Sequence, residues 1–97
     1  MDDTGIKDVV LEEIRDLAEK HGLKRVILFG SRARGDYSRA SDIDLAVEGG
    51  DIVRFALAVD ETTSTLLKYD FVTLSDTTDA KLLENIQREG KILYEKI

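Results

Sequence analysis

The chain has 97 residues, of which 42% are hydrophobic and 35% charged, as is ordinary for one globular domain with a modest core. Its net charge of −6 disfavours a broad nucleic-acid footprint, because such a footprint needs many basic side chains on one face. It has no cysteine, which excludes disulfides and thiolate metal sites, and shows no apolar run that suits a membrane span or signal peptide. We therefore expect a single cytoplasmic domain over residues 1–97, with no membrane contact and no direct nucleic-acid binding.

The first predicted element is a helix capped by Asp2, Asp3 or Thr4. It ends at His21-Gly22, where glycine suits the residue after a helix. His21, the only histidine, is interpreted as a surface or capping residue. Apolar residues at helical spacing form the inner stripe of this helix: Ile6, Val10, Ile14, Leu17 and Ala18.

Two strands joined by a short connection follow. Residues 23–29 predict a buried strand that stops at the Gly30-Ser31 turn. Residues 32–40 predict a helical turn and loop, and residues 43–47 or 43–48 a second strand. The connection is too short for a standard parallel crossover, so we expect a mixed sheet.

The second half predicts a helix, a strand, a helix and a strand. Asp51 is expected to cap a helix with the stripe Ile52, Phe55, Ala56, Val59 and Leu66. A strand over residues 69–74 precedes a last helix with the face Ala80, Leu83, Ile86 and Gln87, for which Ser75, Asp76 and Thr78 are candidate caps. Gly90 ends that helix, and residues 91–95 form a final strand. This alternation predicts an α/β (α+β) fold, a small mixed sheet flanked by helices.

The second strand carries two acids, Asp42 and Asp44, that alternate with apolar Ile43 and Leu45. Because strand side chains alternate between faces, both carboxylates share one face, with Cα atoms about 6.6–7 Å apart. Like charges at this separation repel unless a cation lies between them. Hard divalent cations take such oxygen ligands, and pairs of these ions serve phosphoryl transfer.

The Gly30-Ser31 turn suits a phosphate. Glycine permits close approach to the backbone, Ser31 adds a hydroxyl donor, and a helix starting here would offer free N–H groups. Between Lys24 and Ser41 there are five basic residues and one acid, and Arg32 and Arg34 are among the basic ones. The sequence therefore predicts a positive patch beside a carboxylate site, as a polyphosphate requires.

Gly30-Ser31, ten residues and then Asp42-x-Asp44 together resemble the signature of the DNA polymerase β nucleotidyltransferase superfamily. The fuller string GSRARG…SDIDL is similar to its smallest branch, the minimal nucleotidyltransferase (MNT) domains. The resemblance implies a polymerase-beta-like nucleotidyltransferase fold with ATP as substrate and Mg²⁺, as two ions, for cofactor. It implies phosphate binding by Gly30, Ser31, Arg32 and Arg34.

The family places a third acid on a neighbouring strand. Asp70 is the position that resembles it, and Asp76, its competitor, follows the strand and looks like a cap. The resemblance therefore implies that Asp42, Asp44 and Asp70 are the catalytic residues and metal ligands. Asp70 would also position or deprotonate the attacking hydroxyl.

Three functions follow as alternatives. The resemblance favours an MNT antitoxin that transfers AMP from ATP to a tyrosine of a partner HEPN-domain RNase toxin. It implies that the two proteins form a hetero-oligomer. The expected lack of an acceptor-binding domain agrees with this function. A small-molecule nucleotidyltransferase is disfavoured because such enzymes usually carry an additional helical domain. A non-catalytic module that neutralises the partner by complex formation does not need the complete set of motif residues.

Overall fold

The computed structural model describes residues 4–97 and contains a four-stranded mixed sheet. The strand order is β3-β2-β1-β4, with β1 (Arg25–Phe29), β2 (Ile43–Glu48), β3 (Tyr69–Thr73) and β4 (Lys91–Glu95). β1 runs antiparallel to both β2 and β4, whereas β2 and β3 are parallel. The predicted mixed sheet is thus confirmed, and β2 and β3 are its one parallel pair among the described residues.

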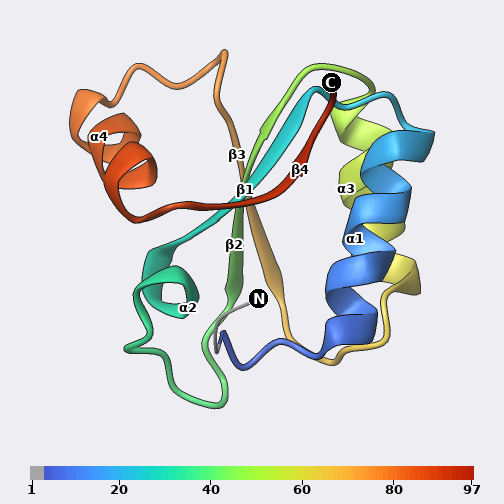
Figure 1. The fold of residues 1–97 in the computed structure, drawn as a ribbon, viewed down its shortest axis with the longest axis horizontal. Coiled ribbons are helices and arrows are strands. Elements are labelled where there is room, and N and C mark those ends of the chain that lie inside the picture. The colour runs from blue at the N-terminus through green and yellow to red at the C-terminus, as the bar shows by residue number, and fades with distance from the viewer. Residues whose placement is uncertain (1–3) are drawn as a thin grey trace.

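Helices lie on both sides of this sheet. α1 (Asp8–Lys20) and α3 (Ile52–Thr62) lie together on one side, and the short α2 (Gly30–Arg34) and α4 (Ala80–Glu89) lie on the other (Figure 1). Within residues 4–97 no helix is long and apolar enough to cross a membrane.

The main core lies between the sheet and the α1/α3 pair. Alternate residues of β2, namely Ile43, Leu45 and Val47, are fully buried in it, as the strand period requires. Phe55 of α3 meets Phe71 of β3 edge to face, with ring centroids 6.3 Å apart. This contact packs β3, which carries Asp70, against α3.

The other face of the sheet holds a smaller apolar cluster. Ala46 of β2 packs with Ile27 of β1 and Ile86 of α4. Asp44 is two residues before Ala46 and points to this same face, because strand side chains alternate. The sequence alternation thus places the acids of β2 opposite the main core.

The start of α1 differs from the prediction. The helix begins at Asp8, and Lys7 precedes it with no side-chain cap. Gly5 has a φ of +69°, which is outside the helical region. Thr4 is buried and does not cap the helix. The other two candidate caps, residues 2 and 3, lie outside the described residues.

Two helix boundaries are also corrected. Leu66, predicted in the α3 stripe, is fully exposed in a loop because α3 ends at Thr62. The cap of α4 is Asp79, whose Oδ1 accepts hydrogen bonds from the amides of Lys81 and Leu82, each at 3.1 Å. It replaces the predicted candidates, residues 75, 76 and 78, because only a residue directly before the first turn can reach those amides.

Candidate active site

Gly30 lies where β1 ends and α2 begins, and its φ is +73°. A Cβ added at this position would collide with the carboxylate of Asp44. The glycine therefore gives both a left-handed backbone and the space for a carboxylate against the main chain. The phosphate contact predicted for Gly30 and Ser31 stays a prediction, and the Asp44 carboxylate lies where a Gly30 side chain would be.

Asp44 and Asp70 are directly paired in the parallel register of β2 and β3. Neighbouring strands lie about 4.8 Å apart, so the two side chains leave the same face of the sheet side by side. Asp42, two residues before Asp44, lies just ahead of β2 and is exposed. Asp44 is half-buried and Asp70 is exposed, so the group opens to solvent.

The electrostatics agree with this grouping. Burial raises the pKa of Asp44 above its ordinary value, and repulsion from Asp70 and then from Asp42 raises it further. The positive charge of Arg34 acts in the opposite direction on the pKa of Asp44. The structure thus brings the three predicted acids into one electrostatic group with Arg34 nearby.

Arg34 is exposed at the end of α2 and forms two ion pairs. Its Nε lies 3.3 Å from Asp36 Oδ2, and its Nη1 lies 3.2 Å from Glu89 Oε2 of α4. The hydrogen bonds to Glu89 and then Asp36 raise the pKa of Arg34, so it stays charged. Ion pairs open to solvent contribute little to stability, and the phosphate contact predicted for Arg34 stays a prediction. The sequence pattern did not predict the contact with Glu89, because Glu89 is 55 residues from Arg34 in the chain.

The structure gives Arg32 a different place from the predicted phosphate contact. Its side chain is 2% exposed, and its guanidinium donates hydrogen bonds to backbone carbonyls. Tyr37 contributes an aromatic ring under it, with the guanidinium carbon 4.9 Å from the ring centroid. Sequence spacing cannot separate this buried arginine from the exposed Arg34, two positions later.

The described residues contain no group of three or more His, Cys, Asp or Glu side chains arranged to hold a metal ion. The predicted role of Asp42, Asp44 and Asp70 as metal ligands stays a prediction. The donor chemistry nevertheless fits Mg²⁺, which commonly binds through one or two carboxylates and takes its other ligands from phosphates and water. The mutual repulsion that raises the pKa of Asp44 is also what a cation would relieve.

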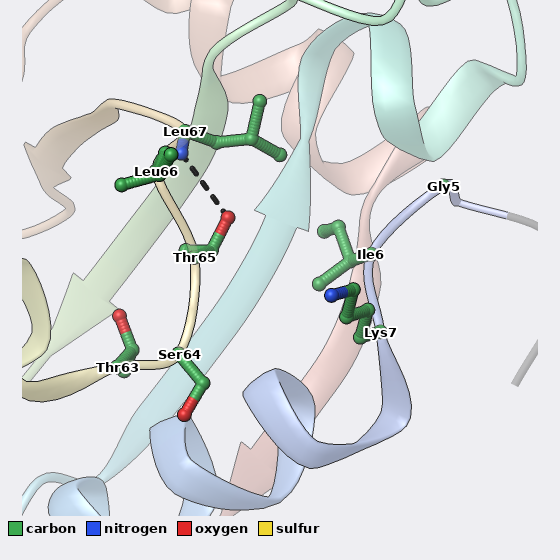
Figure 2. A pocket seen from close by; sticks show the side chains of 8 residues that line it. All are labelled: Gly5, Ile6, Lys7, Thr63, Ser64, Thr65, Leu66 and Leu67. Atoms are coloured by element: carbon green, nitrogen blue, oxygen red, sulfur yellow. Dashed lines mark hydrogen bonds between the residues drawn. The ribbon is translucent and has the colours of Figure 1, made fainter.

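A hollow of about 610 Å³ lies away from these acids, between the segment before α1 and the loop after α3 (Figure 2). Ile6 and Lys7 border it on one side and residues 63–67 on the other. The carboxylates, Gly30 and Ser31 do not line it. We therefore base the site on the carboxylate geometry and not on this hollow.

Comparison with known proteins agrees with the geometry. A protein of Methanocaldococcus jannaschii named "Putative protein adenylyltransferase MJ0604" is 38% identical over 81 residues, covering 74% of this chain and 79% of that protein. A crystal structure described as a toxin-antitoxin with AMP-PNP superposes with a TM-score of 0.70 at 26% identity, covering 89% of this chain and 73% of that one. A structure described as a "putative minimal nucleotidyltransferase" gives 0.65 at 32% identity, covering 84% and 86%.

The family model for the polymerase beta nucleotidyltransferase domain matches residues 12–97, a range that includes every residue of the site described above. The match covers most of the chain, and the fold agrees with that of the minimal nucleotidyltransferases. This chain belongs to the polymerase beta nucleotidyltransferase family.

Proposed function

We propose that this chain is an antitoxin that transfers AMP from ATP, with Mg²⁺, to a tyrosine hydroxyl of a HEPN-type RNase toxin. The observation that carries the nucleotidyl-transfer chemistry is the packing of the Asp44 carboxylate against Gly30, with Asp70 paired beside it. The protein acceptor is supported by the adenylyltransferase name of the 38% identical relative. The toxin partner is supported by the structural neighbour described as a toxin-antitoxin with AMP-PNP.

In this proposal the triphosphate lies over the end of β1. Gly30 and Ser31 contact its phosphate oxygens, and Arg34 leaves Glu89 to pair with one of them. Asp42 and Asp44, with Asp70, would hold Mg²⁺. When bound, Mg²⁺ neutralises phosphate charge and stabilises the leaving group.

The chemical step exchanges one P–O bond for another. The acceptor oxygen attacks the α-phosphorus, the bond from that phosphorus to the oxygen bridging the β-phosphate breaks, and diphosphate leaves. A phenol has a pKa of about 10 and is mostly protonated at neutral pH. Asp70, the exposed member of the paired acids, accepts a hydrogen bond from this hydroxyl and takes its proton during attack.

The test is mass spectrometry of intact proteins. The chain is incubated with Mg²⁺, ATP and the product of the adjacent gene, and we expect the partner to gain one or more AMP units. Asp44→Asn and Asp70→Asn should lose the transfer. Asp76→Asn is the matched control, because Asp76 is an exposed acid six residues beyond Asp70 and outside the site. A partner that is fully inhibited but unmodified would support neutralisation by complex formation and contradict the enzyme.

A further inference from the structure

Arg32 is the one fully buried arginine among the described residues, at 2% exposure. It follows directly on the Gly30-Ser31 turn, in the middle of α2. A buried guanidinium must find acceptors for its five N–H donors, since an unpaired buried charge is strongly unfavourable. The position of those acceptors shows what the side chain holds together.

The acceptors lie on two segments far apart in the sequence. Nε donates to the carbonyl of Ser41 at 3.0 Å, and Nη1 donates to the carbonyl of Thr4 at 3.0 Å. Nη2 donates more weakly to the carbonyls of Arg39 and Ser38, at 3.3 and 3.5 Å. The guanidinium thus joins α2, the residues before α1 and the loop of residues 35–42.

Ser41 is the residue directly before Asp42, and Asp42 precedes the first residue of β2. The carboxylate of Asp42 is exposed, so side-chain packing does not hold it. The hydrogen bond from Arg32 Nε to Ser41 fixes the main chain one residue away from it. Gly5 packs closely against the guanidinium, because a Cβ at this position would lie 2.7 Å from Arg32 Nη1.

The geometry points to Arg32 as a positioning residue that holds the main chain at Asp42 in register with the Gly30-Ser31 turn; this rests on the proposed function, in which Asp42 serves transfer. Arg32 does not contact the phosphates. The planar fork is essential, because one group must reach carbonyls on two segments at once. A lysine keeps the charge but cannot span Ser41 and Thr4.

The test compares Arg32→Lys with Arg39→Lys, which makes the same replacement at an exposed arginine of the same loop. Amide hydrogen exchange is measured first, on protein without ATP. In the Arg32→Lys protein we expect the amides of residues 38–44 to exchange at least tenfold faster, and in Arg39→Lys to stay at the wild-type rate. Tyr37→Leu, which removes the ring under the guanidinium but leaves the fork, should accelerate the same amides less.

Transfer kinetics then separate positioning from phosphate binding. For Arg32→Lys we expect kcat to fall at least tenfold, while the Kd for ATP in calorimetry changes less than threefold. An unchanged exchange rate at residues 38–44, or a loss that lies in the Kd for ATP with kcat intact, would overturn the proposal. Should the wild-type protein transfer no AMP, the proposed function fails, and the exchange comparison alone still decides whether Arg32 holds this segment. If Arg32→Lys does not fold, the exchange rates at residues 38–44 are compared between Tyr37→Leu and Arg39→Lys instead.

Discussion

Gly30 combines two demands that no other residue type meets. Its backbone is left-handed, at a φ of +73°, and its missing side chain leaves room for the Asp44 carboxylate. A left-handed conformation costs an L-residue about 1–2 kcal/mol by itself. A steric clash with Asp44 adds to that cost and displaces a proposed catalytic group.

We predict that Gly30→Ala lowers the free energy of unfolding by more than this strain alone and severely reduces transfer. Gly22→Ala is the control, because Gly22 has a φ of +69° and open space around the added Cβ. Urea unfolding measures the free energy of unfolding of both variants, and the difference between their losses gives the contribution of the clash. Equal destabilisation of the two variants would show that the contact with Asp44 is not tight.

Asp44 gives a prediction about pH. Its pKa is raised in the folded protein, by burial first and then by Asp70 and Asp42, so the unfolded chain releases this proton more readily. Below pH 3.8, the ordinary pKa of this carboxyl, Asp44 is protonated in both the folded and the unfolded protein and costs no stability. The cost of its ionised form appears as the pH rises from there through the higher pKa of the folded protein. Stability is lost, not gained, as Asp44 ionises.

Asp44→Asn should accordingly melt at a higher temperature than the wild type at pH 7 without divalent metal. The difference should shrink as the pH falls toward 4. Thermal unfolding in EDTA across this range measures it, and Asp76→Asn, outside the site, should show no such trend. A lower melting temperature for Asp44→Asn at neutral pH would contradict the repulsion inferred for the acid group.

At the scale of elements, α4 is held in place by contacts that its sequence predicts only in part. Asp79 caps its first turn, and Glu89 in its last turn pairs with Arg34 of α2. Ile86 packs against the sheet beside Ala46, the next residue after Asp44 on the same face of β2. Loosening of α4 would therefore weaken the partner of Arg34 as well as the small apolar cluster.

Asp79→Ala should destabilise the protein by about 1 kcal/mol, because it removes the acceptor of two helix N–H groups. Asp76→Ala should change stability by no more than about 0.5 kcal/mol, as is usual for an exposed residue without such a contact. Denaturant unfolding of the pair distinguishes the observed cap from the one that the sequence also allowed. The reverse order of stabilities would place the start of α4 at Asp76.

At the scale of the whole molecule, the core and the site depend on each other. β3 is an edge strand, and its place beside β2 determines that Asp70 lies next to Asp44. Contact between Phe71 of β3 and the fully buried Phe55 of α3 holds that edge against the main core. Unfolding of the core therefore separates the two carboxylates.

Phe55→Ala should reduce the free energy of unfolding by about 3–5 kcal/mol, a large share of the stability of a small domain. Leu57→Ala in the same helix is the control, since Leu57 is 56% exposed and should cost far less. Both are measured by denaturant unfolding, with the proportion folded at 25 °C followed by circular dichroism. Similar losses for the two variants would mean that α3 does not carry the main core.

The local pattern of residues determined the order of the helices and strands, the mixed sheet and the family to which the chain belongs. Apolar spacing alone determines which face of each helix or strand enters the core, so the alternation in Ile43 to Val47 placed Asp44 opposite the core. The Gly30-Ser31 turn and the Asp42-x-Asp44 pair identified the family because they lie close together in the chain.

Tertiary structure alone decided which distant groups meet. The pairing of Asp44 with Asp70 depends on β2 and β3 being parallel and in register, and neither strand carries that information locally. Arg32 and Arg34 have the same charge two positions apart, yet one is buried against carbonyls and the other reaches Glu89. The physical reason is that burial and long-range hydrogen bonds form only when the chain packs, whereas composition and spacing describe only residues that are close together in the sequence.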